Sequence, residues 1–359
     1  MPYERENIRK LAAYAPGEQP QTARVVKLNT NENPYPPAPA VLEAIRNVPA
    51  EALRRYPPPL AEPFREAAAR VHQLSPEQVI ATNGGDELLR LVITVFCEPG
   101  GGTAAGGLGV AEPSYSLYPV LAAIHDTPIT RIPLGEDFSL PDHFADRLNK
   151  AECRLAMIVN PHAPSGRLQP LDQLEAIARE FHGVLVIDEA YVDFAERDAL
   201  ALLDPARGLD NVLLLRSLSK GYSLAGLRFG YGLGHPNLIA ALDKARDSYN
   251  TDILSQAAAV AALESREVAR EGWQKVIAER DRLMARLCEL DWQVVYPSQT
   301  NFVLAVPPAD GPGAQAIYES LKQQGIFVRW FDQGRLRDKL RITVGTPEQN
   351  DALLEALVG

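Results

Sequence analysis

Short apolar runs of strand length alternate with helical stretches through the first two thirds of this 359-residue chain, and this alternation restricts its fold more than any other feature. Helical patterns begin near Pro39 and return at residues 63–74, 86–96 and 171–181. Alternating strands and helices are typical of a mostly parallel sheet with helices on both faces, so we predict an α/β fold. The candidate strands are residues 79–82, 155–160, 184–188, 211–216 and 228–234.

The pattern changes after about residue 240, which predicts a second, smaller α+β domain. A long helical region from about Asn237 to Leu290 is followed by strand-like runs at 292–297, 301–306, 326–331 and 339–345, with a helix at 314–324. We predict an N-terminal arm over residues 1–35, a large domain over 36–240 and a small domain over 241–359. The glycine-rich residues 99–109 are expected to form a loop.

Composition excludes several classes of function. The chain carries 36 Lys and Arg against 46 Asp and Glu, a net charge of −10, which argues against general attraction to nucleic acid or to an anionic membrane. No apolar run is long enough to cross a bilayer, and the charged N-terminus does not resemble a signal peptide, so a cytoplasmic location is expected. Cys97, Cys153 and Cys288 are predicted to be reduced core thiols, and the six scattered histidines predict no metal site.

The segment from Ser217 to Gly230, SLSKGYSLAGLRFG, carries the strongest chemical signal. It places Lys220 just after a buried strand, where partial desolvation lowers the pKa of an amine and favours its nucleophilic form. Ser217, Ser219 and Arg228 supply donors suited to a phosphate. The alternative is a surface loop with solvated Lys and Arg side chains.

Other predicted strand ends also carry polar or aromatic side chains, and α/β folds bind ligands at that edge of the sheet. Gly85 and Asp86 open a helix whose first N–H groups form an anion site, although a plain helix start is an alternative. Asp188 ends a strongly apolar strand and, unless it is a helix N-cap, needs a cationic partner. Tyr115 can stack on a flat cofactor or lie in the core. Asn160 ends a strand and can donate to an oxygen, unless it is only a turn former. Tyr191 can reach the same site as Asp188.

Together these groups match the needs of pyridoxal phosphate. Its aldehyde needs an amine, its ring nitrogen an anion, its phenolic oxygen donors and its phosphate a cradle.

With these groups the chain resembles the fold-type I aminotransferases, and within them the histidinol-phosphate aminotransferase family. The resemblance covers nearly the whole length and rests on the motifs YAPG, LNTNENP, RYPPP, TNGGDE, EPSYSLY, NPHAPSG, VIDEAY, SLSKGYSLAGLR and KLRITVGT. The family usually has Asn-Asn where this chain has His162 and Ala163, and Ser or Ala is common at Gly85. The resemblance implies a mostly parallel seven-stranded sheet in the large domain.

The resemblance also implies roles for individual residues. Lys220 would carry pyridoxal 5'-phosphate as a Schiff base and Asp188 would pair with its ring nitrogen. Asn160 and Tyr191 would contact the phenolic oxygen, and Tyr115 would stack on the ring. The phosphate would be held by Gly85, Asp86, Ser217, Ser219 and Arg228. Tyr56 would reach the cofactor of a partner subunit in a homodimer, while Arg329, Arg341 and Tyr14 would bind the substrate.

The implied reaction is transfer of an amino group between L-histidinol phosphate and 2-oxoglutarate. Two alternatives use the same machinery: an aromatic-amino-acid aminotransferase, and a decarboxylase of the threonine-phosphate type. A non-catalytic, cofactor-sensing regulatory domain is a third. No added helix-turn-helix segment or basic patch supports it, and the presence of both Lys220 and Asp188 argues against it.

Overall fold

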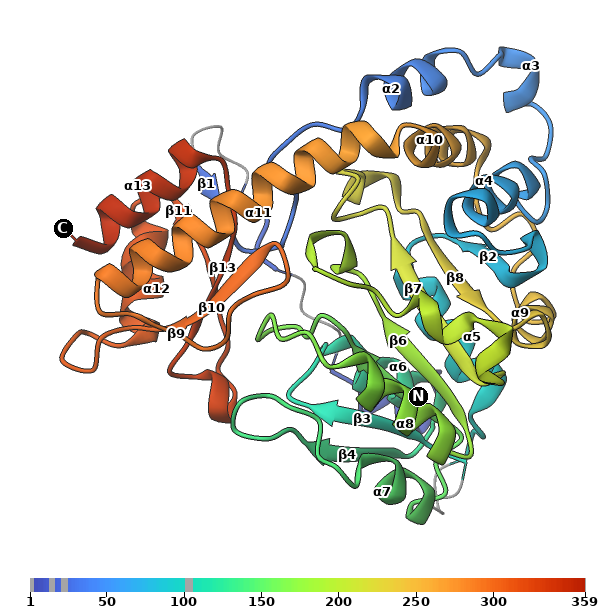
Figure 1. The fold of residues 1–359 in the computed structure, drawn as a ribbon, viewed down its shortest axis with the longest axis horizontal. Coiled ribbons are helices and arrows are strands. Elements are labelled where there is room, and N and C mark those ends of the chain that lie inside the picture. The colour runs from blue at the N-terminus through green and yellow to red at the C-terminus, as the bar shows by residue number, and fades with distance from the viewer. Residues whose placement is uncertain (1–2, 13–16, 21–24, 101–105, 359) are drawn as a thin grey trace.

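A seven-stranded sheet forms the centre of the larger body of the protein in a computed structural model (Figure 1), which describes residues 3–12, 17–20, 25–100 and 106–358. Strand β8 is antiparallel to both of its neighbours, and the other pairs are parallel, so the predicted mostly parallel sheet is confirmed. The strand order is β2 (Val79–Thr82), β8 (Gly230–Gly234), β7 (Val212–Ser217), β6 (Val184–Asp188), β5 (Leu155–Val159), β3 (Leu108–Glu112) and β4 (Ile129–Pro133).

The central strands are apolar at nearly every position because both faces of the sheet are covered. On β7, Leu214 enters one apolar cluster while Leu213 and Leu215 enter the other. The first cluster is covered by α2 (Pro39–Arg46), α4 (Glu62–His72), α7 (Phe144–Lys150), α8 (Leu171–Glu180) and α10 (Ile253–Glu264). The second is covered by α5 (Gly85–Phe96), α6 (Leu117–His125) and α9 (Pro236–Asp243).

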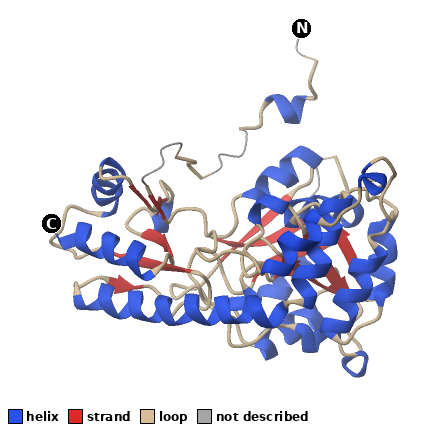
Figure 2. Ribbon diagram, turned by 90° about the horizontal axis from the view of Figure 1, so that it is seen from above, coloured by secondary structure: helices blue, strands red, loops and turns tan. Residues whose placement is uncertain are grey.

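A smaller body contains a second, antiparallel sheet in the order β12 (Arg329–Trp330), β13 (Leu340–Thr343), β10 (Phe302–Val306) and β9 (Gln293–Val294). Helices α12 (Ala314–Gln323) and α13 (Pro347–Val358) pack around it. The long helix α11 (Arg266–Glu289) runs from this sheet to the larger body, as both views show (Figures 1 and 2). Strand β1 (Val26–Lys27) pairs in parallel with β11 (Ile326–Phe327), which fixes the N-terminal segment against the smaller body.

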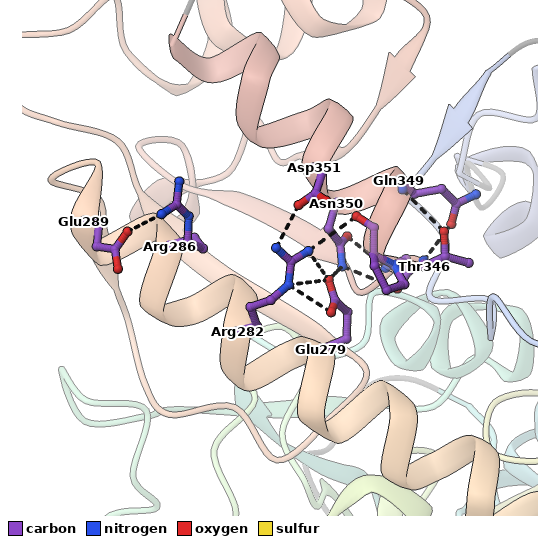
Figure 3. A network of polar contacts seen from close by, with 10 residues as sticks. Glu279, Arg282, Arg286, Glu289, Thr346, Gln349, Asn350 and Asp351 are labelled. Atoms are coloured by element: carbon purple, nitrogen blue, oxygen red, sulfur yellow. Dashed lines mark hydrogen bonds and ion pairs between the residues drawn. The ribbon is translucent and has the colours of Figure 1, made fainter.

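Helix α13 is docked on α11 by a polar network (Figure 3). Arg282 donates to both oxygens of Glu279, at 3.0 and 3.1 Å, and to Oδ1 of Asp351 at 2.7 Å. Asn350, which is fully buried, donates to Glu279 at 3.0 Å. These contacts join the C-terminal helix to the helix that connects the two bodies.

Three sequence predictions about the fold were wrong. Strands β3 and β4 were not among the predicted strands, and β3 begins at Leu108 inside the segment expected to be a loop. Gly109 belongs there because a Cβ at this position would collide with Leu148 of α7. The helical region 237–290 is three helices, since α9 ends at Asp243 and α10 begins only at Ile253.

The third wrong prediction concerns the thiols. Cys97 and Cys153 are buried as expected, whereas Cys288 is exposed on the outer face of α11, where helical periodicity turns it away from the core. Within the described ranges no His, Cys, Asp and Glu side chains cluster in a metal-binding group, and no helix is both long and apolar enough to span a bilayer.

Short helices complete the two bodies and the segments that connect their elements. They are α1 (Glu6–Arg9), α3 (Ala50–Leu53), η1 (Pro76–Gln78), η2 (Val192–Phe194), η3 (Leu200–Leu203), η4 (Pro205–Arg207), η5 (Ala225–Leu227) and η6 (Gly334–Leu336).

Candidate active site

A cavity of about 300 Å³ lies where the carboxyl ends of β5, β6 and β7 face the smaller body. This is the edge at which parallel α/β sheets bind ligands. Most of the predicted site residues line it: Gly85, Asp86, Tyr115, Asp188, Tyr191, Ser217, Ser219, Lys220, Arg228, Arg329 and Arg341. Asn160 and Tyr56 are not among the lining residues, and Tyr14 lies outside the described residues.

Lys220 follows the end of β7, and its half-buried side chain lines the cavity. Its Nζ donates to the carbonyl oxygen of Thr30 at 3.0 Å. Burial, reinforced by the positive charge of Arg341, lowers the pKa of Lys220 to about 8, while Glu32 acts in the opposite direction. About one amine in ten is therefore neutral and nucleophilic at pH 7, a far larger fraction than for a lysine with the ordinary pKa.

The backbone carbonyls of Lys220 and Gly221 are held by two side chains that were not among the predicted site residues. Trp273, on α11, donates its Nε1–H to the carbonyl of Gly221 at 2.7 Å. Asn33 donates to the carbonyls of Lys220 and Gly221, at 3.1 and 3.2 Å. The nucleophile is thus fixed from two segments that are distant in the chain, residues 30–33 and α11, which no local pattern could indicate.

Asp188 ends β6 with its side chain buried under the cavity. The hydroxyl of Tyr118 donates to Oδ2 at 2.8 Å, and the backbone N–H of Ala190 donates to Oδ1 at 3.1 Å. Burial raises the pKa of Asp188 to about 6, although the Tyr118 hydrogen bond opposes the rise. A desolvated carboxylate held by two neutral donors is suited to pair with a protonated ring nitrogen.

The start of α5 forms a cradle of backbone N–H groups for an anion. Gly84 has φ +79°, and a Cβ there would lie 2.7 Å from Nη2 of Arg228. A Cβ on Gly230 would lie 2.6 Å from the backbone nitrogen of Gly85, so glycine at both positions lets β8 and Arg228 approach the helix start. The positive end of the α5 dipole adds to the attraction for a phosphate.

Side chains from the Ser217–Gly230 segment complete this cradle. Arg228 contacts Asp86, with Nη2 and Oδ2 3.4 Å apart. The backbone N–H of Ser219 donates to Oγ of Ser217 at 3.1 Å, which leaves the Ser217 hydroxyl hydrogen able to point at a ligand. The donors predicted for a phosphate therefore lie along one wall of the cavity.

Tyr115 and Tyr191 line the same cavity as Lys220 and Asp188. The Tyr115 ring meets Tyr118 edge to face, with centroids 5.6 Å apart, and its hydroxyl lies 3.4 Å from Asp86. The Tyr191 hydroxyl accepts a hydrogen bond from Asn31 at 3.0 Å. Both rings are thus held in place before any ligand binds.

Asn160 and His162 belong to the loop after β5. Oδ1 of Asn160 accepts from the backbone N–H of Gln169 at 2.7 Å, and the side chain is buried. His162 lies 2.8 Å from the carbonyl of Pro113 through Nε2 and 2.7 Å from Oγ of Ser165 through Nδ1. Burial lowers the pKa of His162 to about 4, so a neutral imidazole fixes this loop.

The smaller body supplies two cationic groups at the far end of the cavity. Arg341, on β13, donates to the carbonyl of Asn29 at 2.8 Å. The Phe331 ring lies against both guanidinium groups, 5.3 Å from Arg329 and 5.5 Å from Arg341. Sequence analysis did not identify Phe331, since an aromatic residue in a strand-like run gives no functional signal by itself.

Tyr56 lies on the surface, 81% exposed, with its ring stacked on Tyr249 at 4.5 Å between centroids. Within the chain described here it does not reach the cavity.

Two ion pairs of the buried Arg216 lie close to the site. Glu189, next to Asp188, accepts from Nε of Arg216 at 2.8 Å, and Arg216 also contacts Asp198 at 2.8 Å. Because successive residues of a strand face opposite sides, these groups point away from the cavity.

The donor set fits pyridoxal phosphate: an amine with a lowered pKa, a buried carboxylate without a cation among its described partners, and a helix-start cradle surround one cavity. The sequence profile described as aminotransferase class I and II matches residues 23–357. The chain therefore belongs to the class I and II aminotransferases.

Within that class, the similar proteins point to one group. The chain is 45% identical to histidinol-phosphate aminotransferase 1 of Trichormus variabilis, with 99% of this chain and 98% of that protein covered. It is 42% identical to histidinol-phosphate aminotransferase of Geotalea uraniireducens, with 98% of each covered. These values place it in the histidinol-phosphate aminotransferase group, as its motifs predicted.

A solved structure has the same fold. The histidinol-phosphate aminotransferase of Sinorhizobium meliloti, in complex with pyridoxal-5'-phosphate, superposes with a TM-score of 0.87 at 28% identity. The match covers 99% of this chain and 97% of the other. The predicted fold-type I architecture is thereby confirmed.

Proposed function

We propose that this protein is a pyridoxal-phosphate-dependent aminotransferase that moves an amino group between L-histidinol phosphate and 2-oxoglutarate. The products would be imidazole-acetol phosphate and glutamate, in histidine biosynthesis. The observation that carries the proposal is that Lys220, Asp188 and the Arg329–Arg341 pair line one cavity. The full-length identity to histidinol-phosphate aminotransferases supports the choice of substrate.

Pyridoxal phosphate, when bound, supplies an aldehyde carbon for the amino group and a ring that accepts electrons from the substrate Cα. Lys220 would hold this aldehyde through Nζ, Asp188 the ring nitrogen, and the α5 cradle with Ser217, Ser219 and Arg228 the phosphate. Tyr115 would lie on the ring, and Tyr191 and Asn160 would approach its phenolic oxygen. For Asn160 this requires its amide nitrogen, since Oδ1 already accepts from Gln169.

Lys220 would act as the general base for the substrate. Its Nζ would take the proton from the substrate Cα and later give it up, and a pKa near 8 suits both transfers. Asp188, as a carboxylate, keeps the ring nitrogen protonated, and Tyr118 holds that carboxylate in line. Thr30, whose carbonyl accepts from Nζ, gives the released amine a resting position.

Arg329 and Arg341 would bind the anionic end of either substrate. One substrate ends in a phosphate and the other in a distal carboxylate, and a guanidinium group pairs with both. Because Arg341 is held to Asn29 and packs against Phe302 and Phe331, its position is fixed before binding. Tyr14 would close over the substrate from the N-terminal arm.

We also propose a homodimer with the active sites at its interface. Tyr56, Leu53 and Tyr249 form an exposed aromatic and apolar surface. In a two-fold dimer this surface would place Tyr56 beside the cofactor of the partner. The division into an arm over 1–35, a large domain over 36–240 and a small domain over 241–359 belongs to the same proposal, as does a cytoplasmic location.

The test is the visible absorption spectrum of the purified, cofactor-loaded protein. Adding L-histidinol phosphate should abolish the band of the lysine-bound cofactor, and adding 2-oxoglutarate should restore it. Lys220→Ala should show no turnover, and Asp188→Ala should bind the cofactor weakly and lose turnover. Normal turnover in either variant would contradict the assignment.

The same experiment separates the alternatives. A band that responds to phenylalanine or tyrosine but not to L-histidinol phosphate would indicate an aromatic-amino-acid aminotransferase. Release of carbon dioxide from a phosphorylated amino acid would indicate a decarboxylase of the threonine-phosphate type. No band after incubation with pyridoxal phosphate would overturn the role of Lys220.

A further inference from the structure

The segment of residues 329–338, which joins β12 to β13, forms one wall of the active-site cavity. Arg329, Phe331, Gln333 and Leu336 from this segment line the cavity. The segment belongs to the smaller body, yet Leu336 is buried in the apolar cluster of the larger one. The position of this wall therefore depends on how the segment is fastened to the larger body.

Arg335 makes that attachment. Its Nη1 donates to the carbonyl of Leu134 at 3.0 Å, and its Nη2 donates to the carbonyls of Gly135 and Glu136 at 2.8 and 2.9 Å. Its guanidinium carbon lies 4.3 Å from the centre of the Phe138 ring. A planar fork that spans three carbonyls and covers an aromatic ring is specific to arginine, because an ammonium group presents no such plane.

The turn that receives Arg335, residues 134–139, is itself rigid. It follows β4, and Phe138 at its tip is buried at 1% exposure. Gln169 donates to the carbonyl of Phe138 at 2.8 Å, and Arg167 donates to Oδ2 of Asp137 at 2.7 Å. Arg335 is thus attached to a fixed base in the larger body.

The other end of the segment contacts Arg329 and Arg341, so its position affects theirs. The indole of Trp330 donates to the carbonyl of Arg337 at 2.7 Å, which links the two ends of the segment. Phe331 lies between them and packs on both Arg329 and Arg341. A displacement of the segment would therefore move the aromatic surface against which both guanidinium groups rest.

We propose that Arg335 is a positioning residue for substrate binding. By fastening the 329–338 segment to the turn 134–139, it sets the place of Phe331 and, through it, of Arg329 and Arg341. The inference rests on the proposed function, since it assumes that the two arginines bind an anionic substrate. None of its contacts involves Lys220, Asp188 or the α5 cradle, so it acts on substrate binding and leaves cofactor binding alone.

The test compares Arg335→Ala and Arg335→Lys with Arg337→Ala in the cofactor-loaded, full-length enzyme. Arg337 is the matched control because its side chain is 65% exposed and pairs only with exposed Asp332 among the described residues, a contact of little energetic weight. Steady-state kinetics with L-histidinol phosphate and 2-oxoglutarate give KM and kcat. Titration of the apoenzyme with pyridoxal phosphate gives the cofactor Kd, and thermal unfolding gives Tm.

Arg335→Ala should raise the KM for L-histidinol phosphate about tenfold, as expected when one charge-assisted attachment is lost. The change in kcat should stay within about threefold, because the segment binds the substrate's anionic end and does not touch the reacting atoms. Arg335→Lys should behave like Arg335→Ala, and Arg337→Ala like the wild type. The cofactor Kd should be the same in all four proteins.

A KM in Arg335→Ala equal to that of Arg337→Ala, or a lower Tm with an unchanged KM, would overturn the inference. Should Arg335→Ala not fold, a wild-type KM in Arg335→Lys would overturn it equally. Failure of the proposed function looks different, since the wild type would then not turn over L-histidinol phosphate. The KM comparison would in that case use the amino donor that the wild type accepts.

Discussion

Replacement of Asp188 by Asn should stabilise the cofactor-free protein while it removes activity. Burial raises the pKa of Asp188 from 3.8 to about 6, so the folded protein keeps a charged group that water would solvate better. This rise corresponds to about 3 kcal/mol of destabilisation when the group is ionised in both states, since one pKa unit is worth about 1.36 kcal/mol. Asparagine can retain both contacts, by accepting from the Ala190 N–H and donating to the Tyr118 hydroxyl oxygen.

The pH dependence of this effect has a definite sign. Between pH 3.8 and about 6 the folded protein holds a proton on Asp188 that the unfolded chain has lost, so the stability contributed by this group falls as pH rises. The destabilisation is therefore complete above about pH 6 and absent below about pH 3.8. Asp188→Asn should gain up to about 3 kcal/mol over the wild type at pH 8 and much less at pH 4.5.

Urea unfolding of the cofactor-free proteins at these two pH values measures the difference. Tyr118→Phe is the control of opposite sign, because it keeps the ring and removes a donor to the buried carboxylate. It should be less stable than the wild type at pH 8 by about 1 to 3 kcal/mol. Saturating pyridoxal phosphate should stabilise the wild type more than Asp188→Asn, since binding to the folded state adds stability according to affinity. An Asp188→Asn protein less stable than the wild type at pH 8 would refute the reasoning.

Two further predictions concern other buried groups. Because the pKa of Lys220 is lowered to about 8, the rate of pyridoxal phosphate attachment to the apoenzyme should rise with pH up to about 8 and then level off. Stopped-flow absorbance measures this rate. A rate that keeps rising to pH 10 would contradict the lowered pKa of Lys220. Arg216→Met should destabilise the protein by about 3 to 5 kcal/mol, since it leaves Glu189 buried without its cationic partner. Urea unfolding at pH 7 measures the loss. An unchanged urea midpoint would show that the Arg216–Glu189 ion pair does not contribute to stability.

The central sheet could be predicted from local pattern because its strands are buried on both faces. β5, β6 and β7 read as continuous apolar runs, and residues 79–82 match β2. Strand β4 could not be recognised in this way. It lies at the sheet edge and its side chains are mostly exposed or half-buried, so the sequence there lacks the apolar run. Gly109 made β3 resemble a loop, although the glycine is required by the close approach of Leu148.

Site residues that depend on local chemistry were predictable, whereas those that depend on long-range contact were not. Lys220 follows an apolar strand and Asp188 is the last residue of one. A polar residue at the end of an apolar strand is expected at the edge of a sheet. Trp273, Tyr118 and Arg335 show no such mark, because each acts through a backbone carbonyl or a carboxylate that is distant in sequence. Their partners lie 52, 70 and 201 residues away.

The sequence by itself determined the α/β class, the strand ends that carry the reactive groups, and the resemblance to the aminotransferases. These properties follow from the period of apolar residues and from short motifs, which are local. Only the tertiary structure decided that Lys220 and Asp188 line one cavity, where desolvation sets their pKa values near 8 and 6. Desolvation comes from the whole surroundings of a group, and those surroundings form only when distant segments pack together.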